Sequence, residues 1–349
     1  MLRPIRRATF NAAASAAIGL TLSLPPRAAS AQGPMYYLEA FGPRGKEIAV
    51  HTWALLALSV AVVLIIGILV LIGAFARRYR GGSDEDGRLP VGQSGSSLKW
   101  IYTGLALTTV ALAGSITWTV VTMAAIDQPS GEPRFTIEIT GQQWWWEVRY
   151  VGDDPSRIFE TANEIHIPVG EPVRVKLRSE DVIHSFWVPA LSGKTDLIPG
   201  RTNETWLQAD TPGVYRGQCA EYCGRQHAHM ALRVFADAAE DFEAWWDEQL
   251  EAADRPETEA TQVGQTQFML RCGACHTVRG TRAGGELGPD LTHLMSRTTI
   301  AAVTLPNTVG HLSGWIANPQ YIKPESKMPN LELSGPQLDV IRSYLLTLQ

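Results

Sequence analysis

Two thiols, an imidazole and a thioether lie close together in one short stretch of the chain. Residues 219–230 read C-A-E-Y-C-G-R-Q-H-A-H-M, which places Cys219, Cys223, His227 and Met230 within one loop-sized segment. Sulfur and imidazole ligands select copper, zinc or iron–sulfur clusters, and a thioether favours copper because zinc rarely binds Met. A structural zinc site or a disulfide explains the two Cys equally well. From this stretch alone, copper and its alternatives stay open.

The other two cysteines belong to a second motif. Residues 272–276 read C-G-A-C-H, and C-x-x-C-H is the signature of covalent c-type haem attachment. We expect Cys272 and Cys275 to bind the two vinyl groups and His276 to be the first axial ligand of the iron. A redox-active C-x-x-C of the thioredoxin kind needs a βαβ setting, which the flanking sequence does not offer.

Length, charge and the N-terminal residues limit the class of protein. A chain of 349 residues suggests two or three domains, and a net charge of −5 argues against a nucleic-acid partner. Residues 1–31 begin with three arginines, continue with an Ala/Leu-rich stretch and end in A-S-A. This pattern predicts a cleaved secretory signal peptide. A third membrane span fits less well, because the apolar stretch is short and is interrupted by two prolines.

Two long apolar segments follow. Residues 48–76 and 100–126 are each long enough to cross roughly 30 Å of hydrocarbon. The loop between them contains more Arg and Lys than Asp and Glu, which places it in the cytoplasm by the positive-inside tendency. We therefore predict that residues 32–126 form a transmembrane hairpin with both termini in the periplasm.

Residues 127–237 are more polar and contain short β-type runs between Pro and Gly turns, which predicts an antiparallel sandwich or barrel. The expected strands cover residues 134–140, 144–150, 164–168, 173–179, 202–207, 213–218 and 231–235. A metal site in such a fold is built from loops at strand ends. His184, in D-V-I-H-S-F-W, is the best candidate for a further ligand. His166 is expected to pack on a strand, and His229 to face solvent or to support a ligand.

Four separated motifs resemble those of one protein family. They read Q-W-W-W-E, S-E-D-V-I-H-S-F-W-V-P, K-T-D-L-I-P-G-R and G-Q-C-A-E-Y-C-G-R-Q-H-A-H-M, in this order after two spans. They resemble subunit II of haem-copper cytochrome c oxidases, over residues 48 to about 235. The C-x-x-C-H region resembles the cytochrome c fused to that subunit in caa-type oxidases. The resemblance implies a multidomain fold: the membrane hairpin, an all-β cupredoxin-like sandwich (127–237), a helix and linker (238–261) and an all-α cytochrome c domain (262–349).

The resemblance also implies a binuclear copper centre, CuA, in which two thiolates bridge two coppers. The residues that match its ligands are His184, Cys219, Cys223, His227 and Met230, together with the backbone carbonyl of Glu221. The side chain of Glu221 matches a position that binds Mg or Mn at the boundary with subunit I; an exposed loop carboxylate is the alternative. Trp144 matches the aromatic residue through which electrons reach CuA.

The same resemblance suggests roles for several other residues. Trp145 and Trp146 alternate faces on a strand and are expected to pack. Glu180 and Asp181 match an acidic surface that steers cytochrome c, although solvated turn acids fit equally well. Lys99 stands where many members have a Glu at the mouth of a proton pathway, so no residue of that pathway is predicted.

The second haem ligand is expected to be a thioether, which gives the raised potential of an electron carrier. Met328, on a late Pro-flanked loop, matches the family's distal ligand. Met295 reads as helix core, and His293 and His311 are the alternatives. Gly288 and Pro289 resemble the segment whose carbonyl orients the proximal imidazole.

The function implied is that of subunit II of a respiratory cytochrome c oxidase. It would accept electrons through its own haem c and pass them to CuA and on to haem a of subunit I, where dioxygen reduction is coupled to proton translocation. The implied partners are subunits I and III, an upstream donor such as a soluble or membrane cytochrome c, and the bilayer of a bacterial inner membrane. The alternatives are the CuA subunit of a nitric oxide or nitrous oxide reductase, and a periplasmic copper or redox relay protein.

Overall fold

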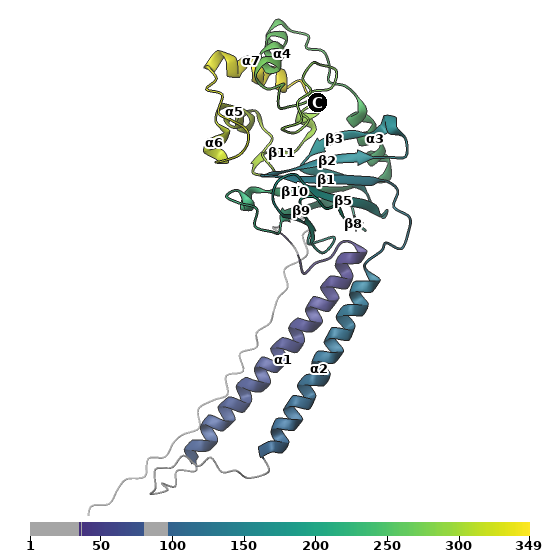
Figure 1. Cartoon of the computed structure of the whole chain (residues 1–349), viewed down its shortest axis with the longest axis vertical. Helices are drawn as coiled ribbons and strands as arrows, with labels where there is room; N and C mark the ends of the chain where they lie inside the picture. Colours follow the sequence, from purple (N-terminus) through teal and green to yellow (C-terminus); the bar gives the residue numbers. More distant parts are fainter. Residues whose placement is uncertain (1–34, 36, 80–96) are drawn as a thin grey trace, which may run out of the picture. The chain divides into compact units, whose positions relative to one another are not determined.

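The computed structural model describes residues 35, 37–79 and 97–349 (Figure 1). The predicted signal peptide and residues 80–96, part of the loop between the predicted spans, lie outside the described residues. The described part of the chain contains two long apolar helices, a β-sandwich and a helical C-terminal region, in this order. This confirms the predicted fold class.

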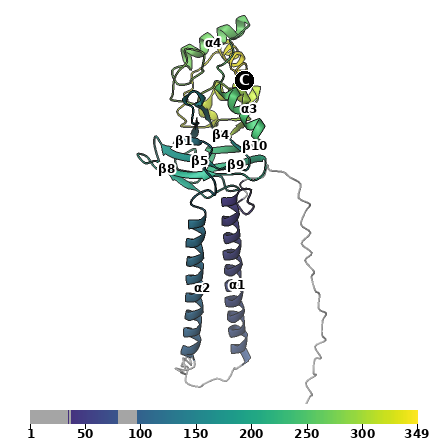
Figure 2. The same cartoon turned by 90° about the vertical axis from the view of Figure 1, so that its right-hand side faces the viewer.

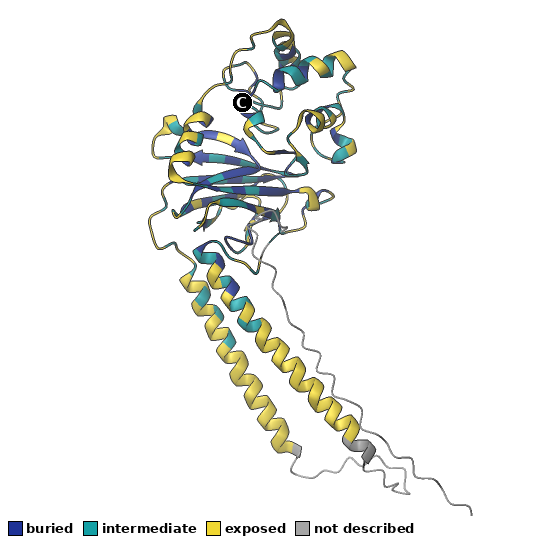
Figure 3. Ribbon diagram, turned by 180° about the vertical axis from the view of Figure 1, so that it is seen from behind, coloured by how far each residue is buried: buried dark blue, intermediate teal, exposed yellow. Residues whose placement is uncertain are grey.

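Two long helices, α1 (Pro43–Tyr79) and α2 (Ser97–Ala125), form the predicted hairpin and run side by side in both views (Figures 1 and 2). Their segments Pro43–Phe75 and Leu98–Ala125 are long and apolar enough to cross a membrane. Their large apolar side chains are exposed along most of their length (Figure 3), as lipid-facing residues would be. One polar contact joins the helices, because Thr119 Oγ1 lies 3.0 Å from His51 Nε2.

The sandwich consists of two five-stranded sheets. The first has the order β3-β2-β1-β5-β8 and the second β4-β10-β9-β6-β7. The strands are β1 (Thr136–Gln142), β2 (Trp145–Val151), β3 (Phe159–Ala162), β4 (Glu164–Pro168), β5 (Val173–Ser179), β6 (His184–Trp187), β7 (Thr195–Leu197), β8 (Asn203–Leu207), β9 (Gly213–Cys219) and β10 (Ala231–Asp237).

The sandwich is mixed, not purely antiparallel as predicted. Strands β1 and β5 pair in parallel, as do β4 and β10. Alternation of apolar and polar residues shows which face of a strand is buried, but it carries no information on the direction of its neighbour. The short strands β3, β6 and β7 were also not predicted, since three or four residues give too little alternation to detect.

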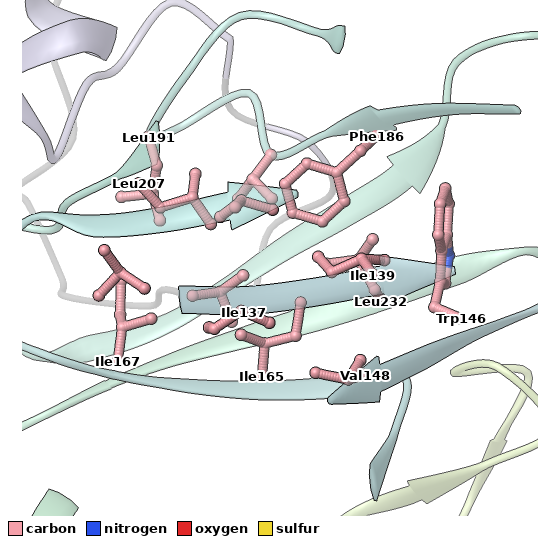
Figure 4. Packing of buried hydrophobic residues seen from close by; sticks show 14 of the residues in the cluster. Ile137, Ile139, Trp146, Val148, Ile165, Ile167, Phe186, Leu191, Leu207 and Leu232 are labelled. Atoms are coloured by element: carbon pink, nitrogen blue, oxygen red, sulfur yellow. The ribbon is translucent and has the colours of Figure 1, made fainter. Parts of the chain in front are cut away.

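The inward side chains of both sheets form one core (Figure 4). Ile137 and Ile139 from one sheet face Ile165 and Leu232 from the other, and all four are fully buried. The helix expected after residue 237 is α3 (Ala239–Leu250), which extends this core by inserting Trp246 among aromatic rings of the sandwich. The core therefore gives the loops at the strand ends a rigid base.

The C-terminal region is a small helical domain. It consists of α4 (Glu259–Arg271), α5 (Val309–Ala317), α6 (Pro319–Ile322), α7 (Gly335–Leu345) and a two-stranded ribbon, β11 (Thr299–Ile300) with β12 (Leu305–Pro306). Capping boxes at Thr258 and Ser334 begin α4 and α7. The two helices cross in close contact at Gly264, where an added Cβ would lie 2.0 Å from Val340 O. This crossing brings Phe268 and Ile341 together in the domain's own core.

Candidate metal centres

The five predicted copper-ligand side chains converge at one end of the sandwich. His184 begins β6, Cys219 ends β9, and Met230 directly precedes β10. Cys223 lies in the connection between β9 and β10, and His227 begins a short 3-10 helix in the same connection. Strand pairing therefore brings His184 next to the loop of residues 219–230, which starts 35 residues later in the chain.

The two thiols form the centre of this cluster. Cys219 Sγ and Cys223 Sγ lie 3.8 Å apart, and His184 Nδ1 is 3.9 Å from Cys219 Sγ. His227 Nδ1 is 3.6 Å, and Met230 Sδ 3.8 Å, from Cys223 Sγ. A disulfide needs sulfurs about 2.05 Å apart, so this arrangement is that of free thiols surrounding a small space. Each imidazole presents its Nδ1 to a different sulfur, which suits two metal ions better than one.

Burial and hydrogen bonding prepare the thiols for metal binding. Cys219, Cys223 and Met230 are buried, and His184 is fully buried. The S–H···S contact lowers the pKa of Cys219 and raises that of Cys223. One thiolate thus forms easily, and a cation is needed to displace the second proton, as happens when metals bind thiols.

A second layer of contacts fixes His184. Its Nε2 lies 2.8 Å from Asp181 Oδ1, so the ring's Nδ1 is the nitrogen available to a metal. Gly141 lies against the ring, since a Cβ there would be 2.8 Å from Cδ2 of His184. Burial lowers the pKa of His184, but its contacts with Asp181 and Cys219 outweigh burial and the pKa is raised.

Glu221 offers two different groups. Its carbonyl oxygen is 3.2 Å from Cys219 Sγ, so this oxygen faces the cluster. Its side chain is exposed. Among the described residues, the group of His, Cys, Asp and Glu with metal-binding spacing is His184, Cys219 and Cys223. The carbonyl of Glu221 thus lies next to the thiols, whereas its exposed carboxylate is not a member of this group.

Trp144 is joined directly to the copper loop. Its indole N–H donates a hydrogen bond of 2.9 Å to the carbonyl of Cys223, and Gln143 Nε2 donates to the same oxygen at 2.8 Å. Its neighbours differ: Trp146 is fully buried in the sandwich core, as expected, whereas Trp145 is half-buried. Of the three tryptophans, Trp144 is hydrogen-bonded to a predicted copper ligand, whereas Trp146 packs edge-on against the ring of His184 with the ring centroids 6.1 Å apart.

The predicted haem ligands meet in a cavity of the C-terminal domain. Cys272, Cys275, His276 and Met328 all line it. His276 Nδ1 lies 2.8 Å from the carbonyl of Pro289, which leaves Nε2 for a metal. Burial lowers the pKa of His276, so its ring stays neutral and can bind iron. Gly288 leaves room for this ring, because a Cβ would lie 2.6 Å from Cε1 of His276.

The competing axial ligands lie elsewhere. His293 contacts the carbonyls of Glu251 and Gln349, and His311 is exposed and contacts Thr308. Neither lines the cavity, whereas Met328 does.

A cation in the cavity also fits a haem. Arg297 lines it, donates through Nη2 to the carbonyl of Asp290 at 2.5 Å, and has a buried Nε with no hydrogen-bond partner among the described residues. A haem brings two carboxylates that such a group can bind. The residues of the cavity therefore fit a covalently attached haem.

The cavity is not closed by its own domain alone. Gln143, Trp144, Trp145 and Asn163, all from the sandwich, also line it. The sequence predicts both sites, but it does not indicate that one residue, Trp144, belongs to both. Lys323 is also buried and lines the cavity, and a lysine between an isoleucine and a proline carries no sequence signal of burial.

The two histidines of the sandwich that were not predicted as metal ligands, His166 and His229, lie as expected. His166, on β4, is half-buried and stacks between Phe235 and Trp245. His229 is exposed and its Nδ1 lies 2.7 Å from Gln226 Oε1. Neither contacts the thiol cluster.

Comparison with known proteins gives one consistent family. Residues 151–236 match the family described as cytochrome c oxidase subunit II, periplasmic domain, and residues 262–349 match the cytochrome c family. The cytochrome c oxidase subunit 2 of Alkalihalophilus pseudofirmus is 34% identical over 319 residues, which cover 89% of this chain and 91% of that protein. That of Bacillus subtilis is 26% identical over 347 residues, 93% of this chain and 96% of that protein. The solved periplasmic domain of subunit II of a cytochrome oxidase from Bradyrhizobium japonicum is 34% identical, with a TM-score of 0.32, and covers 35% of this chain and 96% of that one.

Proposed function

Because the chain belongs to the family of cytochrome c oxidase subunit 2 and carries a cytochrome c domain, we propose that it conducts electrons from its own haem c to a binuclear copper centre and on to haem a of a partner subunit. It is a subunit of a haem-copper oxidoreductase. The dioxygen chemistry and proton translocation belong, in this proposal, to the partner chains, of which subunit I is the acceptor.

The copper centre would be held by the thiolates of Cys219 and Cys223, the imidazoles of His184 and His227, the thioether of Met230 and the carbonyl of Glu221, of which Met230 and Glu221 would be the weak ligands that tune the potential. When bound, it would supply a one-electron carrier with small reorganisation on reduction. The chain's own contribution is rigidity and exclusion of water: the ligand side chains are largely buried and are fixed by strand pairing and by Asp181.

The haem would be attached to Cys272 and Cys275 and ligated by His276 and Met328. Bound in this way, it supplies a low-spin one-electron carrier of raised potential. Pro289 orients the His276 ring through its carbonyl. Gln320 holds the Met328 loop, because its Nε2 donates to the carbonyl of Met328 at 2.7 Å.

One observation carries the proposal: Trp144 both lines the haem cavity and donates a hydrogen bond to Cys223. A single side chain thus contacts both predicted centres, which makes it the natural route between them.

The membrane hairpin anchors the chain. We place both metal domains on the periplasmic side of a bacterial inner membrane, where c-type haem is attached, and assign the exposed Glu221 carboxylate to a Mg or Mn ion shared with subunit I.

The test uses the purified full chain. Optical and electron-spin spectra should show a low-spin haem c and the multi-line hyperfine pattern of one electron shared by two copper nuclei. Trp144→Phe keeps an aromatic ring but removes the N–H donor to Cys223. It should preserve both spectra while slowing electron transfer from haem to copper, and Trp245→Phe, on α3 and outside the cavity lining, is the matched control. A chain without the mixed-valence copper signal, or equal rates in Trp144→Phe and wild type, would contradict the proposal.

A further inference from the structure

The haem domain and the sandwich are joined by a buried carboxylate. Glu164, on β4, is 4% exposed. Its two oxygens accept three hydrogen bonds from the haem domain: from Thr298 N at 2.9 Å, from Thr298 Oγ1 at 2.7 Å and from Thr299 Oγ1 at 2.5 Å. Burying a charge costs free energy unless the charge is fully hydrogen-bonded. This carboxylate has its hydrogen-bond partners when the two domains are in contact and would lose them if the domains separated.

A buried amine that lines the haem cavity makes a second contact. Lys323 is 3% exposed, and its Nζ donates to the carbonyl of Trp144 at 2.6 Å and to that of Ala301 at 3.2 Å. Burial lowers the pKa of Lys323 to about 7. The amine can donate to both carbonyls whether or not it is charged, so it fixes the position of the backbone of Trp144 over a wide pH range.

A strained turn lies between these two contacts. Ala301, Ala302 and Val303 all have positive φ, of 54°, 57° and 63°. Such residues adopt this conformation only when their surroundings impose it. Here Lys323 binds the carbonyl of Ala301, and the N–H of Ala231, which follows a predicted copper ligand, lies 3.4 Å from the carbonyl of Ala302. The turn is thus held from both sides of the interface, by Lys323 of the haem domain and by Ala231 of the sandwich.

Among the remaining polar contacts of the same interface, Gln226, which is 5% exposed, donates through Nε2 to the carbonyl of Pro324 at 3.0 Å, whereas the ion pairs are more exposed. Arg225 pairs with Glu325 at 2.6 Å with both side chains more than half exposed, and Lys327, 53% exposed, lies 3.3 Å from Asp181. Ion pairs of this kind contribute little and are screened by salt. The buried contacts of Glu164, Lys323 and Gln226 must therefore provide most of the directional specificity.

From these contacts we infer that Glu164 and Lys323 are positioning residues that lock the haem domain onto the copper-binding sandwich. The lock holds Lys323, which precedes the Met328 loop, against Trp144 and shields Trp144, which is 5% exposed, from outside electron donors. An external donor then reduces the haem, and the haem is the route to the copper. This inference rests on the proposed function, because it concerns how the two centres are held for electron transfer.

The size of the effect follows from the hydrogen bonds. Replacing Glu164 by Gln keeps the shape but turns one acceptor into a donor that faces Thr298 or Thr299. Losing one hydrogen bond to a charged group weakens an interaction by roughly 10- to 150-fold. Lys323→Met keeps most of the length of the side chain and removes both donors, so the carbonyl of Trp144 is left without this partner.

The test measures the lock in the full chain loaded with copper and haem. The readouts are the rate of electron transfer from haem to copper after rapid reduction of the haem, its dependence on salt, and the magnetic coupling between the two oxidised centres. The variants are Glu164→Gln and Lys323→Met, one in each domain. Glu204→Gln and Lys194→Met are the matched controls, because both side chains are exposed.

We expect the wild type and both controls to transfer electrons at a rate that changes little with salt. In Glu164→Gln and Lys323→Met, both spectra should persist, the magnetic coupling should weaken, and the rate should fall further as salt screens the exposed pairs. Wild-type rate, coupling and salt response in both variants would overturn the inference while leaving the proposed function intact. Absence of the copper or haem signal in the wild type would instead count against the proposed function. If one variant fails to fold, the other, together with Thr298→Val, decides.

Discussion

Gly264, at the crossing of α4 and α7, is the position where one added methyl group should do most damage to the haem domain. A Cβ there would lie 2.0 Å from the backbone oxygen of Val340 and 2.8 Å from Cβ of Tyr344. Carbon and oxygen need more than 3 Å, and the obstructing atom is backbone, so no side-chain rotation can make room. In Gly264→Ala the two helices must move apart by about 1 Å.

Two opposing free-energy contributions decide whether Gly264→Ala stabilises or destabilises the domain. Ala is a better helix former than Gly by about 1 kcal/mol. Overpacking typically costs about 1–3 kcal/mol, and a clash with backbone belongs at the upper end. We therefore expect Gly264→Ala to lower the free energy of unfolding by about 2 kcal/mol. For a domain of this size, this corresponds to a fall in melting temperature of roughly 8–16 °C.

Gly314 provides the control within the same domain. It lies in α5 and an added Cβ meets no atom within 4 Å, so Gly314→Ala should stabilise by about 0.5–1 kcal/mol through helix propensity. Thermal unfolding of the full chain, followed by haem absorbance, compares the two variants with wild type. The reasoning fails if Gly264→Ala melts at or above the wild-type temperature, or if both variants shift in the same direction.

Three further predictions concern the two sites and one buried acid. Burial, assisted by Glu160, raises the pKa of Glu147 from 4.5 to about 7. The native chain therefore keeps a proton that the unfolded chain has released, and stability should fall as pH rises from about 4.5 to 7; denaturant unfolding at several pH values should show a flatter profile in Glu147→Gln. Met328→Ala should keep the haem covalently attached but shift its spectrum from low to high spin and lower its potential in an optical redox titration. Cys223→Ser should abolish the mixed-valence copper signal and leave the haem spectrum unchanged, as metal analysis and electron-spin spectra of one sample can show.

Much of the fold could be read from local patterns. Residues 48–76 and 100–126 are predominantly apolar and contain no Asp, Glu, Lys or Arg, and the structure extends the first helix back to Pro43, a residue that suits the first turn of a helix. The longer strands were found because their burial alternates, as in β5. Parallel pairing and the short β6 were missed, because both depend on neighbours that are distant in the sequence. His184 was still selected correctly as a neighbour of the thiols, but from its motif and not from its strand.

The contacts between the domains could not be read from the sequence. Glu164 meets Thr298 across 134 residues, and Lys323 meets Trp144 across 179. On its own strand, Glu164 is one more polar residue at a strand end. Its burial is produced by a domain whose docking no local pattern encodes. For the same reason Trp144, expected to be the residue through which electrons reach the copper centre, is covered by the haem domain.

Asp181 shows how a haem domain attached to the same chain changes the role of an acidic residue. Steering by acidic side chains raises the rate at which a free basic protein arrives, but a domain attached to the same chain is already present at high effective concentration. In this chain Asp181 is committed to internal contacts: one oxygen orients His184, and the other accepts from the backbone N–H of Gln143 and pairs with Lys327 of the haem domain. These hydrogen bonds outweigh burial and lower its pKa. The carboxylate thus links the copper-ligand ring to the loop that carries Met328, and the predicted steering surface retains Glu180 as its exposed member.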